Sequence, residues 1–267
     1  MTGRQSNFQE GRRSVRKVRG GTNLTYSLVE TLGQSIVSGE FSSDRKFPTE
    51  SELSQIYGAS HSITREAVKM LTAKGLLRAR PRQGTAVEPE AQWNLFDPDV
   101  LRWHLERKFS LKLLLHFTEM RLAVEPTAAA LAAKNADAEG LAEIREGLER
   151  MKRAESGADD TVSADVAFHV AILKATGNPF YRRLDEMVNT ALRISIRFTN
   201  MIKGHEADIG AHEAVLNAIV ARDPDKASAL MQTIIRDVIL LIGEGIAGKL
   251  GVKTAWLAEP NLDAASK

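Results

Sequence analysis

The sequence predicts a mainly α-helical protein of two domains, a small winged helix-turn-helix followed by an all-α bundle of six or seven helices. Three observations support this prediction. The 267 residues fit two domains better than one. Apolar residues recur at helical spacing through most of the chain, and short strands are predicted only at 76–79 and 85–87. Residues 1–87 carry 14 Lys/Arg and 7 Asp/Glu, whereas the remainder carries 22 and 27, so only the front of the chain is basic.

The front domain is assigned to residues 22–88. Its first helix spans 24–38, where leucine and isoleucine recur at helical spacing, and Gly39 ends it. A second helix opens at Thr49, and Glu52 three residues later completes a capping box. These two helices provide the scaffold for the segment that follows.

A third helix is predicted from the cap residue Ser60 to about Ala73, after a turn at Gly58. A two-stranded wing follows, with its tip at 80–84. Helix, turn, helix and basic wing together favour DNA binding, in which the third helix enters the major groove. The alternative is a small helical domain with solvent-facing charges.

Polar residues at the beginning of a recognition helix are placed to reach base edges, and cationic wing residues are placed to reach phosphates or the minor groove. The predicted DNA-binding residues are His61, Ser62, Thr64, Arg65, Arg80, Arg82, Gln83 and Gly84. Double-stranded operator DNA is the expected partner.

Three segments lie outside the two predicted domains. Residues 1–21 form a polar, basic arm that we expect to be disordered, either tracking phosphates or solvated. Residues 89–97 form a linker whose aromatic residues favour packing over flexibility, and residues 248–267 form a loose tail.

The back domain is assigned to residues 98–247. It shows no strand alternation, and breaks at 177–179 and 222–224 separate its helices. The expected helices are 98–107, 110–134, 137–156, 160–176, 178–200, 206–222 and 224–247. They predict an all-helical bundle.

Asp165 and His169 are four residues apart on one predicted helix and therefore share a face, and His212 lies on a later helix. One carboxylate and two imidazoles form a sensible ligand set for a divalent transition ion, for which zinc is the first candidate. Judged from spacing alone, a histidine on such a face is more often a satisfied core or surface residue than a metal ligand.

Arg121 lies in an apolar helix and needs an anionic partner if it is buried. That partner is either a carboxylate of the protein, such as Glu119 or Glu125, or the carboxylate of a bound effector, which a guanidinium binds well. Arg193 is a second candidate of the same kind.

The front domain resembles the winged helix-turn-helix of the GntR superfamily. The resemblance rests on the stretches 47–53, 60–67, 75–77 and 83–85. It departs at His61 and Ser51, where the family commonly has arginine, so no operator sequence can be carried over.

The back domain resembles the FCD ligand-binding domain of the FadR subfamily, through EMRLAVEPTAAALAA at 119–133 and the later Asp and His residues. The resemblance implies a metal held by one Asp and three His. Asp165, His169 and His212 match, but Ile234 stands where the third His is expected. The site therefore takes water or effector as further ligands, binds metal weakly, or uses these residues as hydrogen-bonding groups. The resemblance also places Arg121 at the effector site.

The linker, QWN at 92–94 with DVLRW at 99–103, is similar to that of family members regulating sugar-acid catabolism. We therefore expect a homodimeric repressor, released from its operator by a small carboxylate such as an aldonate. The alternative is a metal-dependent enzyme acting on a sugar acid, which would leave the winged helix unexplained. No cysteine is present, which excludes disulfides and thiolate sites and is compatible with the cytoplasm. No apolar run is long enough to cross a membrane.

Overall fold

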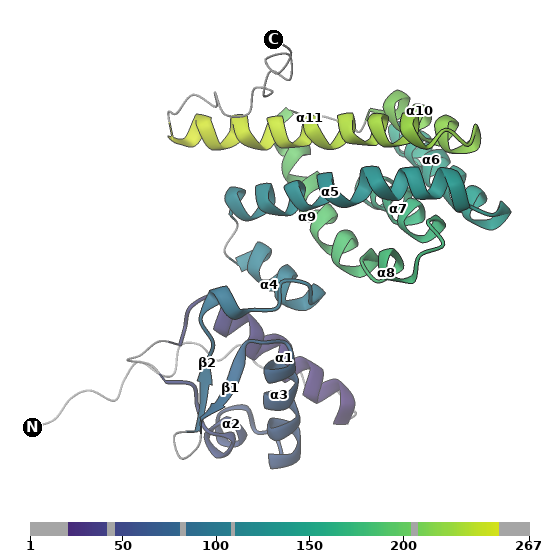
Figure 1. The fold of residues 1–267 in the computed structure, drawn as a ribbon. Helices are drawn as coiled ribbons and strands as arrows, with labels where there is room; N and C mark the ends of the chain where they lie inside the picture. The colour runs from purple at the N-terminus through teal and green to yellow at the C-terminus, as the bar shows by residue number, and fades with distance from the viewer. Residues whose placement is uncertain (1–20, 42–45, 81–83, 108–109, 204–207, 251–267) are drawn as a thin grey trace, which may run out of the picture. The chain divides into compact units, whose positions relative to one another are not determined.

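The computed structural model describes residues 21–41, 46–80, 84–107, 110–203 and 208–250. These residues belong to two compact units, Met1–Lys108 and Phe109–Lys267. The predicted mainly helical fold is confirmed (Figure 1). The basic arm lies outside the described residues except for Gly21, and most of the predicted tail, from 251 onward, lies outside them as well.

The front unit contains the predicted winged helix-turn-helix. Its elements are α1 (Gly21–Val37), α2 (Glu50–Tyr57), α3 (His61–Ala73), β1 (Leu77–Arg80) and β2 (Gly84–Val87). The two strands pair antiparallel, with Leu77 opposite Val87 and Arg80 opposite Gly84. The wing is therefore a tight hairpin that follows α3 directly.

Local hydrogen bonds begin α2 and α3 as the sequence indicates. The Thr49 hydroxyl accepts from the Glu52 amide, and the Glu52 carboxylate accepts from the Thr49 amide at 2.7 Å. The Ser60 hydroxyl accepts from the Ile63 amide to start α3. Gly58 separates the helices with φ +62, a conformation that favours glycine. The predicted capping box and caps are confirmed.

The helix α4 (Pro98–Arg107) packs on α1 within the front unit. Trp103 is only 1% exposed and belongs to the same apolar core as Leu32 and Leu71. The indole lies against Gly33 of α1, where any side chain would collide with the ring. The sequence pattern predicts that residues 98–107 belong to the helical body. In the structure their apolar face is covered by α1, although the functional domain boundary itself stays a prediction.

Charged contacts also connect α4 to the winged helix. Lys74, the C-cap of α3, binds both Asp97 and Asp99 at 2.9 Å. Arg102 of α4 binds Glu30 of α1 at 2.7 Å and Asp99 at 3.2 Å. The beginning of α4 is thus fixed to the end of α3, and its middle is fixed to the middle of α1.

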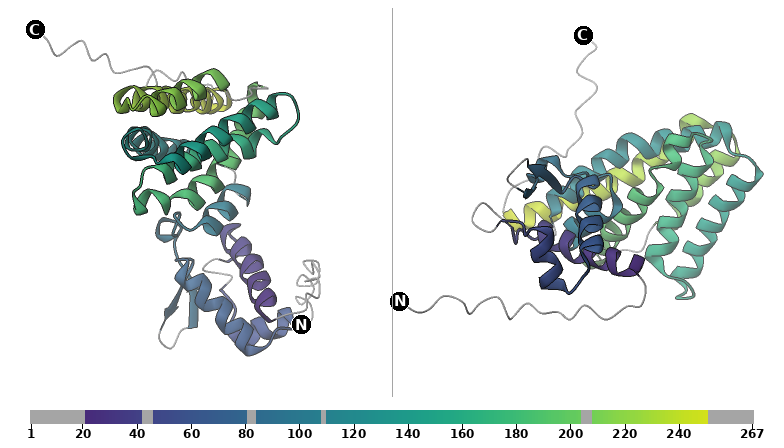
Figure 2. Two further views of the ribbon diagram at one scale, coloured as in Figure 1. Left: turned by 90° about the vertical axis from the view of Figure 1, so that its right-hand side faces the viewer. Right: turned by 90° about the horizontal axis from the view of Figure 1, so that it is seen from below.

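The second unit is a bundle in which α5 and α11 pack together along their length, as do α6 and α7 (Figure 2). The predicted helix at 178–200 is two helices, because Arg183 ends a short turn that Asn178 begins. The remaining predicted spans agree with the structure to within a few residues. The elements are α5 (Leu111–Asn135), α6 (Ala138–Glu155), α7 (Thr161–Ala175), α8 (Pro179–Arg182), α9 (Asp185–Lys203), α10 (Ile209–Val220) and α11 (Pro224–Leu250).

Candidate DNA-binding surface and metal centre

The first turn of α3 presents polar side chains to solvent. His61, Ser62 and Arg65 are exposed. Arg65 makes one weak ion pair, at 3.4 Å, with Glu50 of α2. Thr64, by contrast, is fully buried, and its hydroxyl donates to the His61 carbonyl at 3.1 Å. Three of the four helix residues predicted to contact DNA are therefore accessible, and the fourth is part of the core.

Only some of the wing residues predicted to contact DNA are among the described residues. Gly84 is exposed with φ +83 and leaves room for a close approach to its backbone. Arg82 and Gln83 lie outside the described residues, as does the side chain of Arg80. On the neighbouring strand, Arg78 pairs with Glu88 at 3.5 Å.

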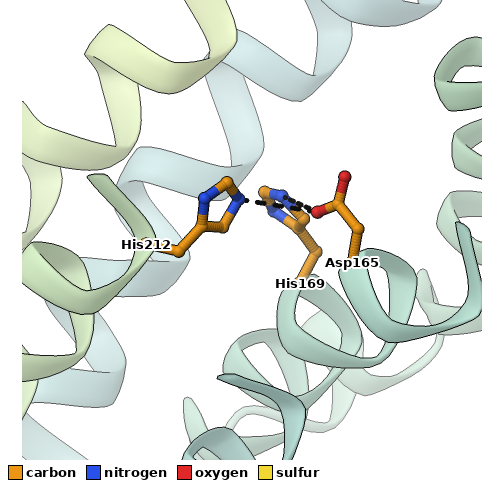
Figure 3. Close-up of side chains that lie close together, drawn as sticks. All are labelled: Asp165, His169 and His212. Carbon is orange, nitrogen blue, oxygen red and sulfur yellow. Dashed lines mark ion pairs between the residues drawn. The ribbon is translucent and has the colours of Figure 1, made fainter. Parts of the chain in front are cut away.

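In the body, α7 and α10 bring together the three residues predicted to bind metal. Asp165 and His169 extend from successive turns of α7, and His212 approaches from α10 (Figure 3). Asp165 Oδ1 lies 3.2 Å from His169 Nε2 and 3.5 Å from His212 Nε2. One ligand atom from each residue lies within 4.8 Å of the other two. The sequence spacing thus becomes a compact cluster of one carboxylate and two imidazoles.

The cluster has the properties of a metal site. All three side chains are buried, and among the described residues Asp165 Oδ1, His169 Nδ1 and His212 Nε2 make ion-pair contacts but no hydrogen bond of good geometry. Buried polar atoms rarely stay unpaired without a reason. Zinc bonds of about 2.0–2.2 Å in a tetrahedral arrangement place ligand atoms roughly 3.3–3.6 Å apart, close to the separations from Asp165 Oδ1. These residues therefore fit a divalent ion.

A second carboxylate, Glu125 of α5, extends the cluster. Its Oε2 lies 2.6 Å from His169 Nδ1, the imidazole nitrogen that faces away from Asp165. Its two oxygens also accept from Arg121, at 2.5 and 3.2 Å. Sequence reasoning named Glu125 only as one possible partner of Arg121. The single available signal was the four-residue spacing, and that spacing says nothing about His169.

The charges of the cluster perturb one another strongly. Burial alone would raise the pKa of Glu125, but Arg121 and His169 lower it to about 2. Burial would lower the pKa of His169, but Glu125 and Asp165 raise it to about 9. The pKa of Asp165 is likewise lowered, against the effect of burial, by the two histidines. Without a metal, the cluster is a chain of alternating charges.

The two arginines predicted to bind an effector have different surroundings. Arg121 is 3% exposed, and its pairing with Glu125 is the protein-carboxylate alternative that the sequence left open. Arg193 of α9 is half-buried and donates to Asn189 and to the Ser163 hydroxyl of α7, at 2.8 and 2.9 Å. Both residues lie in or against the helices that carry the cluster.

Comparison with known proteins places both units in one family. Residues 24–87 match the bacterial regulatory proteins of the gntR family, and residues 116–237 match the FCD domain. The galactonate operon transcriptional repressor of Escherichia coli K12 is 33% identical over 80% of this chain and 94% of its own length. The chain belongs to the GntR family. It is a DNA-binding transcription regulator with an FCD domain and not an enzyme.

Two further proteins are similar to most of this chain. The E. coli K12 HTH-type transcriptional regulator YieP is 32% identical over 84% of this chain and 97% of its own length. The solved structure of Lar, described as controlling the Listeria monocytogenes agr system, covers 86% of this chain and 99% of its own, with a TM-score of 0.57 at 16% identity. At that identity the likeness shows the fold alone.

Two further observations concern the helices of this GntR regulator. Ile234, at the position where a third histidine was expected, lies half-buried on α11 and cannot bind a metal through its side chain. Among the described residues, no helix is both long and apolar enough to span a membrane.

Proposed function

We propose that this GntR regulator is a homodimeric repressor whose body binds a divalent ion and a small organic acid, and that the acid lowers its affinity for operator DNA. The convergence of Asp165, His169 and His212 is the observation that carries this proposal. A buried cation site in the body gives an anionic ligand a specific place to bind. Because the same chain carries a winged helix, binding of the ligand can change the affinity for DNA.

DNA contacts are proposed at the exposed start of α3 and at the wing. Arg65 is the residue best suited to a guanine edge or a phosphate, and His61 and Ser62 flank it. Gly84, Arg80, Arg82 and Gln83 remain the proposed wing contacts. Thr64 holds the first turn of α3 through its buried hydroxyl instead of reaching the groove. Two copies of the chain are proposed because a two-fold operator matches a two-fold protein.

Asp165, His169 and His212 would hold the ion, with zinc as the first candidate. When bound, such an ion supplies positive charge and open coordination positions for oxygen ligands. Because Ile234 supplies no fourth ligand, at least one position of a tetrahedral site is available to water or effector. The effector would then complete the coordination sphere.

A sugar acid of the aldonate type fits this chemistry, because its carboxylate and neighbouring hydroxyls are oxygen donors. The similarity to the galactonate operon transcriptional repressor supports this class. Arg193 is the proposed cation for the effector carboxylate. The same role for Arg121 remains a prediction from the sequence, although its guanidinium is already paired with Glu125.

The proposal is tested by operator binding. The full-length protein is titrated against fluorescent DNA from the region upstream of its gene, with a panel of aldonates, with added zinc or with chelator. We expect one acid to weaken binding at least tenfold, and only when metal is present. Unchanged DNA affinity with every acid in the presence of zinc would refute the effector part, and no binding to any flanking DNA would refute the operator part.

A further inference from the structure

The contact between Glu125 and His169 assigns each nitrogen of that imidazole to a different carboxylate. Nδ1 lies 2.6 Å from Glu125 Oε2, and Nε2 lies 3.2 Å from Asp165 Oδ1. An ionised carboxylate only accepts hydrogen bonds, so the nitrogen that faces Glu125 has to carry the proton. In the neutral ring the lone pair is then on Nε2, which faces Asp165 and His212.

Arg121 fixes Glu125 in turn. Its Nε donates to Oε1 and its Nη2 to Oε2 at 3.2 Å, so that both carboxylate oxygens are held in one plane. Arg121 and Glu125 are 3% and 1% exposed, and they are one turn apart on α5. A buried carboxylate held from both sides has little freedom to rotate away from His169.

We infer that Arg121 and Glu125 are a positioning pair that presents Nε2 of His169, and not Nδ1, to the divalent ion. The inference rests on the proposed metal centre and adds to it two residues that do not touch the ion. Groups that orient ligating histidines commonly change metal affinity by about 10–100-fold when they are removed. Arg121 on this view acts through Glu125, and its charge is not primarily a clamp for the effector.

A purely structural salt bridge between α5 and α7 is the competing explanation. It would make the same contacts and would contribute to the stability of the metal-free protein. It would leave metal affinity unchanged in a variant that still folds. Metal affinity and metal-free stability therefore have to be measured on the same variants.

Cobalt(II) is a suitable probe because it occupies zinc sites and its visible absorption reports coordination geometry. Glu125→Gln keeps the size of the side chain but removes the charge that requires the proton on Nδ1. We expect the cobalt dissociation constant of the full-length chelated protein to rise about 10–100-fold, with an altered visible spectrum. Glu119→Gln, an exposed change on the same helix, is the matched control and is expected to leave both unchanged.

Arg121→Lys provides a second variant in case Glu125→Gln does not fold. Lysine keeps the positive charge but cannot hold both oxygens in a plane. We expect a smaller rise in the dissociation constant, of about three- to tenfold. Wild-type affinity in folded Glu125→Gln or Arg121→Lys, with only the melting temperature lowered, would overturn the inference. Failure of the wild-type protein to bind cobalt or zinc would instead show that the metal centre itself is wrong.

Discussion

The contact between Gly33 and Trp103 predicts that Gly33→Ala changes the free energy of unfolding in opposite directions in the presence and in the absence of the Trp103 ring. A Cβ at position 33 would lie 2.6 Å from Cε3 and 2.5 Å from Cη2 of the indole, and nearer still to Cζ3. Trp103 is 1% exposed within the front core and has little room to retreat. Overpacking of this kind costs about 1–3 kcal/mol, and three short contacts with one rigid ring favour the upper end.

The helix itself opposes that cost. Alanine is more favourable than glycine inside a helix by about 1 kcal/mol, and Gly33 lies inside α1. Gly33→Ala should therefore lower the free energy of unfolding of the front unit by about 1–2 kcal/mol. Trp103→Ala alone should lower it by about 3–5 kcal/mol. In the Trp103→Ala background, Gly33→Ala should be neutral or stabilising by up to about 1 kcal/mol, because the ring is absent.

Urea unfolding measures all four proteins. Far-UV circular dichroism follows the helices, and tryptophan fluorescence, to which Trp93 contributes in every variant, gives a second signal. The double-mutant cycle yields a coupling energy between the two positions. If Gly33→Ala stabilises the wild-type background, or costs the same with and without Trp103, the packing argument is refuted.

Three other predictions concern DNA binding, pH and metal. Arg65→Ala should weaken operator binding by about 1–3 kcal/mol while changing the free energy of unfolding by less than about 0.5 kcal/mol. The control Arg145→Ala, an exposed change in the body, should bind DNA normally. Equal effects of the two variants in a DNA titration would argue against α3 as the helix that contacts the bases. Burial raises the pKa of Glu30, but the hydrogen bond from Arg102 outweighs burial, so the pKa in the folded protein is lowered. The stability that Glu30 contributes is therefore present above the ordinary carboxyl pKa of about 4 and is lost as the pH falls through the pKa of the folded protein. As the pH is lowered below about 5, the urea concentration at the unfolding midpoint should therefore decrease more steeply for the wild-type protein than for Glu30→Gln. Parallel plots of midpoint against pH for the two proteins would contradict this. Zinc at 100 times its dissociation constant should stabilise the body by about 2.7 kcal/mol in thermal melts, and His212→Ala should abolish this stabilisation. A melting temperature that changes with neither zinc nor chelator would count against the proposed metal site.

Local signals in the sequence were sufficient to predict the elements of the front unit. Thr49 with Glu52, Ser60 and Gly58 each act within a few residues, so their caps and turn follow from spacing alone. The pairing of Asp165 with His169 follows from helix periodicity in the same way. The residues alone made His212 only a weak candidate, because nothing local connects α10 to α7, and the family resemblance then supported it.

The remaining features depend on contacts between elements that are distant in the sequence. The apolar face of α4 was visible in the sequence, but periodicity does not say which helix covers it, and α1 does so through the space that Gly33 leaves open. The importance of Glu125 was missed for a similar reason. Its spacing from Arg121 suggests an ordinary salt bridge, and its second partner, His169, comes from another helix.

The double contact of Lys74 has a mechanical consequence. This residue ends α3 and holds both carboxylates at the beginning of α4, so the chain between wing and α4 is bridged by two short charged bonds. Turning α4 against α3 would break both. A displacement of α4 would therefore be passed to the end of α3 through these two ion pairs.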